Sequence, residues 1–137
     1  YGALYNWFVL DAGSNGGKNV CPTGWHVPSD EEWTTLTTYL GGEGVAGGKL
    51  KEAGTTHWES PNTGATNESG YTALPSGIRS YNGAFSIVVG SFCVWWSSSE
   101  YSTSSAYLRS MDYGNSNVYR DYFDKPYGYS VRCLRDL

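Results

Sequence analysis

A helical pattern confined to one early segment, with strand patterns after it, most constrains how this chain can fold. Ser29 and Glu32 have the spacing of a capping box, in which each side chain accepts a hydrogen bond from the other residue's backbone N–H. Apolar residues then recur on one helical face, at Trp33, Leu36 and Leu40. Gly41-Gly42 ends the run. The sequence therefore predicts an amphipathic helix over residues 30–40 that packs on the core through Trp33.

The segments on either side of this helix carry weaker signals. Residues 1–10 predict a strand or a short helix, with its core residues at Leu4, Trp7, Phe8 and Leu10. A second, shorter helix is expected over residues 46–52, although Gly47-Gly48 disfavours it. Residues 53–70 are rich in Gly, Thr, Asn, Ser and Pro, which predicts a long loop anchored by Trp58.

From Tyr71 onward the pattern is that of β-strands. Asn82-Gly83 is a strong turn signal and predicts a hairpin between residues 77–81 and 84–87. Further strands are expected at residues 93–98, 106–111, 118–123 and 129–134. A helix early and antiparallel strands later indicate the α+β class. The 137 residues suffice for a single domain with one hydrophobic core.

Composition excludes several classes of function. The net charge of −4 gives a nucleic-acid partner no electrostatic basis. No apolar run is long enough to insert into a bilayer. The chain opens on Tyr1 without a methionine, so we expect it to lack N-terminal residues of a longer protein.

Tyrosine is concentrated near the end of the chain, and tryptophan occurs only in the earlier part. Seven of the twelve tyrosines fall within residues 101–129, whereas all six tryptophans lie earlier. Tyrosine among Ser, Asn, Gly and Asp is typical of binding surfaces such as antibody loops, because its ring gives a large, rigid contact area. The sequence therefore predicts a tryptophan-rich scaffold that carries a tyrosine-rich recognition face. The alternative is an ordinary exposed sheet, since tyrosine also favours strands.

The candidate ligand contacts all lie in this C-terminal region. The aromatic candidates are Tyr101, Tyr107, Tyr113, Tyr119, Tyr122 and Tyr127. Their candidate polar partners are Asp112, Asn115, Asn117, Arg120, Asp121 and Asp124. Arg109, Arg132 and Arg135 either hold an anionic ligand or pair with acidic side chains, and bidentate structural pairing is the favoured alternative.

Cysteine and histidine usage gives little basis for metal or catalytic chemistry. Cys21, Cys93 and Cys133 allow at most one internal disulfide, with three possible pairings, or three reduced thiols. His26 and His57 have no ligand partners at zinc spacing, so no metal site is expected. Ser-His-Asp catalysis lacks its elbow motif. We expect no cofactor and no enzyme activity.

The chain resembles a known family along nearly its whole length. Residues 20–33, VCPTGWHVPSDEEW, resemble the signature CPxGWHVPSxxEW of the Fibrobacter succinogenes major paralogous domain. Matching segments follow at residues 47–51 (GGKLK), 67–75 (NESGYTALP), 95–98 (WWSS) and 130–136 (SVRCLRD). The resemblance implies a C-type-lectin-like fold of the formylglycine-generating-enzyme branch, with antiparallel strands, one or two helices and long loops.

The resemblance also implies a disulfide and a location. In that fold a disulfide commonly joins the first helix to the last strand, which suits Cys21 and Cys133. Tyr129 sits where the family tends to carry Phe and is expected in the core. Family members are typically secreted or surface proteins of bacteria, which implies an extracellular or cell-surface location.

Calcium and enzyme chemistry are known among proteins of this fold. The calcium-dependent sugar-binding motifs of lectins do not occur in this sequence, and Asn67-Glu68 could contribute loop oxygens to a structural calcium site. The formylglycine-generating enzymes depend on paired cysteines. Residues 90–93 resemble half of such a site, but no second cysteine lies near Cys93 unless Cys133 is free.

A second resemblance concerns the tail. Variable proteins of diversity-generating retroelements often use this fold and end in a region rich in Tyr, Ser, Asp, Asn and Thr, as residues 101–129 are. The expected function is therefore a non-catalytic, surface-displayed binding domain for a protein or glycan on another cell or host surface. The alternatives are a structural subunit of a surface or pilus-like assembly and, less favoured, a thiol- or copper-dependent oxidase.

Overall fold

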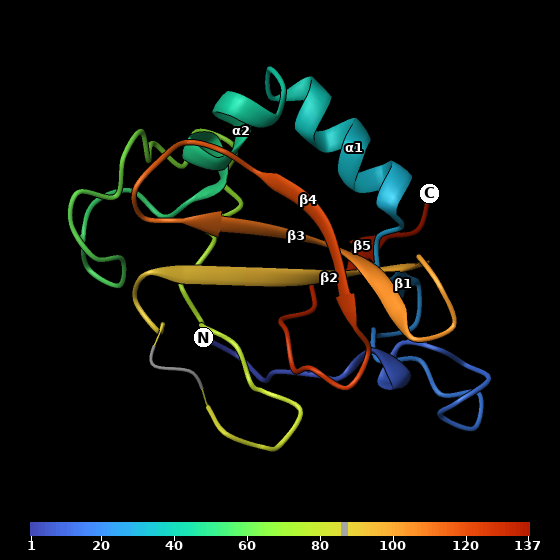
Figure 1. Ribbon diagram of the computed structural model, residues 1–137. Coiled ribbons are helices and arrows are strands. Elements are labelled where there is room, and N and C mark those ends of the chain that lie inside the picture. Colours follow the sequence, from blue (N-terminus) through green and yellow to red (C-terminus); the bar gives the residue numbers. More distant parts are fainter. Residues whose placement is uncertain (86–87) are drawn as a thin grey trace.

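The computed structural model describes residues 1–85 and 88–137 as a pair of helices beside a three-stranded antiparallel sheet (Figure 1). Its elements are η1 (Trp7–Val9), β1 (Trp25–His26), α1 (Asp30–Tyr39), α2 (Glu43–Leu50), β2 (Phe92–Glu100), β3 (Ser105–Asp112), β4 (Tyr119–Asp124) and β5 (Leu134–Arg135). The main sheet has the order β2-β3-β4, and β1 pairs antiparallel with β5 in a small second sheet. The expected α+β class is confirmed.

The first helix follows its sequence signals closely. The Ser29 hydroxyl accepts a hydrogen bond from the Glu32 N–H at 3.1 Å, and the Glu32 carboxylate accepts one from the Ser29 N–H at 2.8 Å. This is the predicted capping box. Thr37 is buried although it is polar and lies outside the apolar stripe of Trp33, Leu36 and Leu40. Thr37 lies one turn after Trp33 and therefore shares its buried side, where its hydroxyl donates to the Trp33 carbonyl.

The second helix starts three residues before its expected position and includes both disfavoured glycines. Gly47 and Gly48 are buried against other backbone. A Cβ on Gly47 would collide with the Asn117 carbonyl, and one on Gly48 would collide with the Gly64 carbonyl. The glycines therefore permit close packing of α2 on two loops, and this contact outweighs their low helix propensity.

Each face of the main sheet carries its own hydrophobic cluster. In register, Trp95 of β2 faces Arg109 of β3, which faces Arg120 of β4. Side chains alternate between faces, so Cys93, Trp95 and Met111 share the face covered by α1. The opposite face presents Val94, Trp96, Ala106 and Leu108, which pack with Trp7 and Tyr129. The expected burial of Tyr129 is confirmed.

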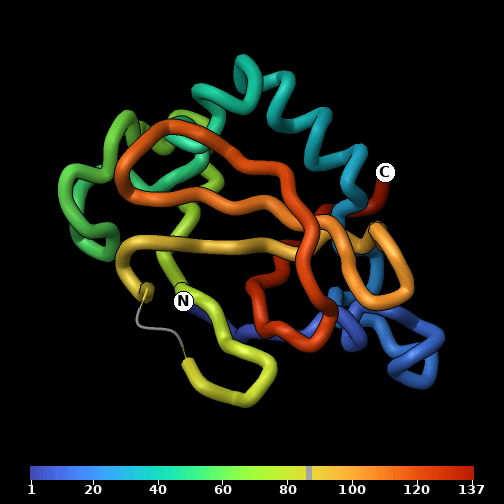
Figure 2. Tube along the Cα trace, viewed as in Figure 1, coloured from blue at the N-terminus to red at the C-terminus, as the bar shows by residue number. Residues whose placement is uncertain are grey.

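The N-terminal segment runs along this second face beside the end of the chain (Figure 2). Tyr5 forms an antiparallel bridge with Tyr129. Trp7 is buried, and its indole N–H donates to the Ser97 carbonyl at 2.9 Å. Phe8 was expected in the core but is 41% exposed. Successive residues of a 3₁₀ turn point in different directions, so burial of Trp7 leaves Phe8 outside.

The remaining strand expectations hold in part. The predicted turn at Asn82-Gly83 is present, with the Gly83 N–H donating to the Ser80 carbonyl. Its second expected strand, residues 84–87, includes positions 86 and 87, which lie outside the described residues. The last strand was expected over residues 129–134 but is reduced to single bridges at Tyr129 and Ser130, followed by β5. Residues 53–70 contain no helix or strand, and Trp58 anchors them by donating to the Ala73 carbonyl.

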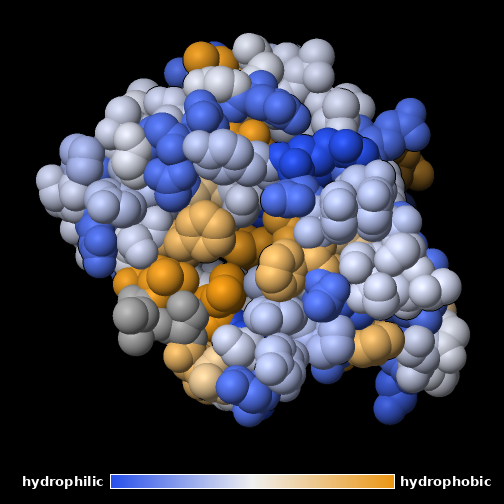
Figure 3. Space-filling model, viewed as in Figure 1, coloured by the Kyte–Doolittle hydropathy of each residue, from blue (hydrophilic) through white to orange (hydrophobic). Residues whose placement is uncertain are grey.

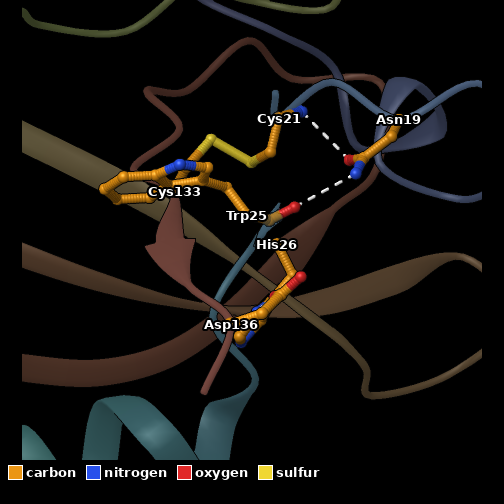
Figure 4. The surroundings of a disulfide bond; sticks show 6 residues. All are labelled: Asn19, Cys21, Trp25, His26, Cys133 and Asp136. Atoms are coloured by element: carbon orange, nitrogen blue, oxygen red, sulfur yellow. Dashed lines mark hydrogen bonds and ion pairs between the residues drawn. A yellow bond between two sulfur atoms is a disulfide. The ribbon is translucent and has the colours of Figure 1, made fainter. Parts of the chain in front are cut away.

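A disulfide joins Cys21 to Cys133, the pairing that the resemblance implies (Figure 4). It connects the approach to α1 with the end of the chain, 112 residues apart. Asn19 braces this region, accepting from the Cys21 N–H and donating to the Trp25 carbonyl. Trp25 is 40% exposed, unlike the other five tryptophans, which are buried.

No helix in the described part of the chain is long and apolar enough to span a membrane.

Candidate functional site

Four of the predicted contact residues form one group, which we call the phenol cluster: Tyr101, Tyr107, Arg120 and Tyr122. The rings of Tyr101 and Tyr122 stack with their centroids 3.6 Å apart, and Tyr107 meets Tyr101 edge-on at 5.4 Å. The guanidinium carbon of Arg120 lies 4.3 Å from the centroid of the Tyr107 ring. Tyr101 and Tyr122 are about half exposed, so the cluster presents aromatic surface to solvent.

Asp30 of α1 fixes this cluster to the scaffold. Its carboxylate pairs with Arg120 at 2.8 Å and with buried Arg109 at 2.7 Å. Burial opposes ionisation of Asp30, but hydrogen bonds from the two arginines outweigh it and hold its pKa below the ordinary value. The same bond raises the pKa of Arg120. No sequence signal identifies this role of Asp30, because its two arginine partners lie 79 and 90 residues away.

A second group is a polar network, which we call the amide turn: Asp112, Asn115, Asn117 and Tyr119. Asn115 donates to the Asp112 carboxylate at 2.7 Å and to the Tyr119 hydroxyl at 2.9 Å. Asn117 donates to the same hydroxyl at 3.1 Å. These bonds give the turn between β3 and β4 a defined shape.

Lys51 supports the amide turn from inside the protein. Its buried ammonium donates to three carbonyl oxygens, those of Thr63, Asp112 and Asn115, at 2.8–3.1 Å. It also lies 5.3 Å from the centroid of the Trp58 ring. Burial lowers the pKa of Lys51. The sequence gave no sign of this role, since a lysine at a helix end normally reads as a solvated residue.

The remaining candidates are dispersed. Asp121 and Tyr127 line a groove of about 460 Å³ on the second face of the sheet. Its apolar lining includes Ile78, Phe92, Leu108 and Phe123. Figure 3 shows apolar side chains gathered around a hollow over the strands. Tyr113 is half-buried against the cluster beneath α1, and Asp124 accepts a bond from Ser105. Tyr113 therefore belongs more to the scaffold than to the exposed surface.

Strand β4 brings these groups together because it ends the main sheet. All six of its residues are exposed, and no strand among the described residues pairs with its outer edge. Alternation along β4 sends Arg120 and Tyr122 toward one face and Tyr119, Asp121 and Phe123 toward the other. One short strand thus supplies both the phenol cluster and the rim of the groove.

The residues considered for metal binding and for thiol chemistry make contacts within the protein. No group of three or more His, Cys, Asp or Glu side chains suited to a metal occurs within residues 1–85 and 88–137. The Asn67 side chain bonds to Thr72, and Glu68 pairs with Lys49 at 3.0 Å. Cys93 is fully buried, and burial raises the pKa of its thiol well above the usual value.

The chain matches a protein-family model along nearly its whole length. The Fibrobacter succinogenes major domain model matches residues 1–135. The chain belongs to this family. Comparisons with curated proteins and with solved structures give no match. Membership in the family therefore rests on almost the whole chain, whereas the function must be argued from the site itself.

Proposed function

We propose that this family member is a non-catalytic binding domain that captures its ligand on the phenol cluster, the amide turn and the edge of β4. The observation that carries this proposal is the exposure of four aromatic side chains in and beside one edge strand. Tyr101, Tyr119, Tyr122 and Phe123 are each 42–49% exposed. Rigid rings held at the surface are the usual basis of recognition, because little side-chain entropy remains to be lost on binding.

The electrostatics of the phenol cluster also support binding. Arg120 is held in place by Asp30 and Tyr107, so its guanidinium is oriented before a ligand arrives. Pre-organisation of this kind lowers the entropic cost of association. Tyrosine faces with Asp and Asn hydrogen bonds suit a protein or a glycan, and we propose such a ligand on another cell or host surface.

The wider setting of this proposal follows from the family. We propose a C-type-lectin-like fold and an extracellular or bacterial cell-surface location, which the disulfide supports because such bonds persist in oxidising compartments. We also propose that a retroelement diversifies the tail. Replaceable side chains on a fixed backbone suit that mechanism, and the exposed residues of β4 have this character.

A binding comparison between two tyrosine variants tests the proposal. Tyr101→Ala combined with Tyr122→Ala removes the stacked pair, and Tyr39→Ala removes a ring that is 86% exposed on α1, away from the tail. A glycan array and a panel of bacterial and host cells serve as probes. We expect capture to be lost in the double variant and kept in Tyr39→Ala, with both melting temperatures near that of the unaltered protein. Equal loss in both variants would reject the proposed face.

A structural subunit of a surface assembly is the second candidate, and the outer edge of β4 favours it. An edge strand offers backbone groups that can pair with a strand of another chain. Solution mass separates the two candidates, because a stable oligomer that buries Tyr119 and Tyr122 supports the assembly. The thiol-dependent oxidase is the least supported alternative, since a buried thiol with a raised pKa is a poor nucleophile.

A further inference from the structure

The groove on the second face of the main sheet, which we call the second-face groove, lies on the side of β4 away from the phenol cluster. Its volume of about 460 Å³ falls within the usual range of about 300–1,000 Å³ for ligand pockets. Its floor crosses all three strands of the sheet, and Figure 3 shows apolar side chains around it. Its lining includes Phe92, Leu108, Ser110, Asp121, Phe123 and Tyr129.

Two hydroxyls in this lining have no partner in the protein. Ser110 is 7% exposed and Tyr129 is 4% exposed, and neither side-chain oxygen bonds to a described residue. Among the described residues, the unpartnered side-chain atoms sealed from solvent lie elsewhere, at Trp33, Asn62 and Tyr71, so solvent reaches both hydroxyls. The groove is the cavity that both residues line, and their hydroxyls therefore open into it. Buried polar groups are nearly always hydrogen-bonded, so this pair needs a partner from outside the protein.

The charge in the groove is negative. The Asp121 carboxylate accepts a hydrogen bond from the Tyr122 N–H at 2.8 Å but forms no ion pair within the described part of the chain. No described lysine or arginine lines the groove, since Arg120 points to the other face, where it pairs with Asp30. Burial, and then nearby acidic groups that include Asp121, raise the pKa of Tyr129, so its hydroxyl stays protonated. The groove therefore favours a cation.

Strand register places this carboxylate close to one of the two hydroxyls. Asp121 pairs with Leu108, and Ser110 is the next residue of β3 on the same face. Diagonal neighbours of this kind lie about 7–8 Å apart, so one ammonium group can contact both side chains. The rings of Phe92 and Phe123 also line the groove, and the faces of aromatic rings attract cations.

We propose that the second-face groove binds a small primary amine with an apolar ring or chain. A primary ammonium carries three N–H donors. The Asp121 carboxylate and the hydroxyls of Ser110 and Tyr129 accept them. The apolar body of the ligand lies against Phe92 and Phe123. This site goes beyond the capture function proposed for the phenol cluster, and either one can fail without the other.

Phenethylamine is a suitable probe, and phenethyl alcohol and phenylacetate are its neutral and anionic controls of similar shape. Calorimetry follows binding to the intact, oxidised protein in about 0.15 M salt, which screens charges farther than about 8 Å. We expect one saturable site for the amine, about tenfold weaker binding of the alcohol, and no binding of phenylacetate. Absence of amine binding to the folded protein overturns the proposal. Equal affinity for the alcohol overturns the assignment to cations.

A pair of charge variants on β4 locates the site. Asp121→Asn removes the charge but keeps an oxygen that can accept from the Tyr122 N–H. Asp124→Asn removes a charge from the same strand on its other face, where Asp124 accepts from Ser105. We expect Asp121→Asn to weaken phenethylamine binding about tenfold and to leave phenethyl alcohol unaffected, whereas Asp124→Asn changes neither. Equal losses in the two variants would show attraction to the surface at large and reject the groove.

A pair of serine variants tests the unpartnered hydroxyls. Ser110→Ala breaks no internal bond, so the melting temperature should stay the same or rise while phenethylamine binding weakens about threefold. Ser97→Ala removes a hydroxyl that donates to the Tyr107 carbonyl at 3.0 Å, so it should lower the melting temperature and leave the affinity unchanged. The proposal fails if Ser110→Ala lowers the melting temperature and leaves the affinity intact.

The variant without the stacked phenols separates this site from the capture face. Tyr101→Ala combined with Tyr122→Ala removes side chains that lie on the other side of β4 from the groove. The double variant should therefore bind phenethylamine as tightly as the unaltered protein. Loss of amine binding in this variant would overturn the assignment to the second-face groove.

Discussion

The tyrosine-rich tail and the pocket between α1, Tyr71 and the disulfide hold their side chains in place by opposite means. In the phenol cluster most contacts join exposed residues of neighbouring strands, and one buried ion pair to Asp30 anchors them. The pocket is lined by residues from three distant segments, which a disulfide and α1 hold together. The exposed side chains of the phenol cluster can therefore change at little cost to folding, whereas the buried side chains around the pocket cannot.

Removal of the disulfide is expected to have the largest effect and to separate the two regions. In Cys21→Ser combined with Cys133→Ser, the free energy of unfolding in urea should fall by about 4 kcal/mol, because the unfolded chain regains the entropy of a loop of about 100 residues. The fluorescence of Trp33 should change as well, since Trp33 and Cys133 line the same pocket. Ligand capture by the tail should persist wherever the variant is still folded.

The third cysteine supplies the control for this variant. Cys93→Ala removes a buried thiol but no cross-link, so it should lower the free energy of unfolding by only about 1 kcal/mol. Thiol titration of the unfolded, unreduced protein should find one free group. Three free groups, or equal destabilisation by both variants, would contradict the role given to the disulfide.

Lys51→Met is the next largest change, and it tests whether part of the tail depends on the interior. The variant leaves three carbonyls without the donor that Lys51 supplies from the interior and should lower the free energy of unfolding by about 3 kcal/mol. Because two of these carbonyls belong to Asp112 and Asn115, the amide turn should lose order in NMR spectra. Lys49→Met, whose ammonium forms a partly exposed pair with Glu68, should change the unfolding free energy by less than about 0.5 kcal/mol. Similar losses in the two variants would remove the support proposed for the turn.

Two tyrosines of the tail sharpen the comparison further. Tyr113→Ala should lower the free energy of unfolding by about 2 kcal/mol, because its ring packs against the cluster beneath α1. Tyr122→Ala should change it by less than about 0.5 kcal/mol, because that ring is exposed. Chemical denaturation of both variants decides the matter. A large loss for Tyr122→Ala would mean that the phenol cluster is part of the core.

Local signals predicted the helix and the long central strands well. The capping box at Ser29 and the runs of consecutive buried residues in β2 and β3 are local features, so the sequence contains nearly all the information they need. α2 was harder to place, because Gly47 and Gly48 meet backbone from residues 64 and 117. Such contacts are set by tertiary packing and leave no periodic signal.

The candidate site was predictable in composition but not in grouping. The abundance of tyrosine pointed to residues 101–129, yet Tyr113 turned inward while Tyr101 and Tyr122 stacked outside. Whether a ring points in or out depends on strand register, which a single sequence specifies poorly where turns are irregular. Asp30 and Lys51 were missed for a related reason, since all their partners except Thr63 lie 61–90 residues away.

The smallest expected effect is a pH dependence confined to the pocket side of the molecule. His26 bonds to Asp136 at 2.6 Å and to Glu32 at 2.9 Å, and these bonds raise its pKa. Since the folded-state pKa exceeds the unfolded value of about 6.5, the stabilisation is full below that value and is lost as pH rises through the folded pKa. The difference in melting temperature between the unaltered protein and His26→Gln should therefore be largest near pH 6 and disappear in mildly alkaline buffer.

The same titration distinguishes the two regions. His26 and His57 are the only histidines in the chain, and neither lies in residues 101–129. Capture by the phenol cluster should therefore stay constant over the same pH range. A tail that followed the same pH curve would mean that the two regions are coupled, and the comparison drawn between them would not hold.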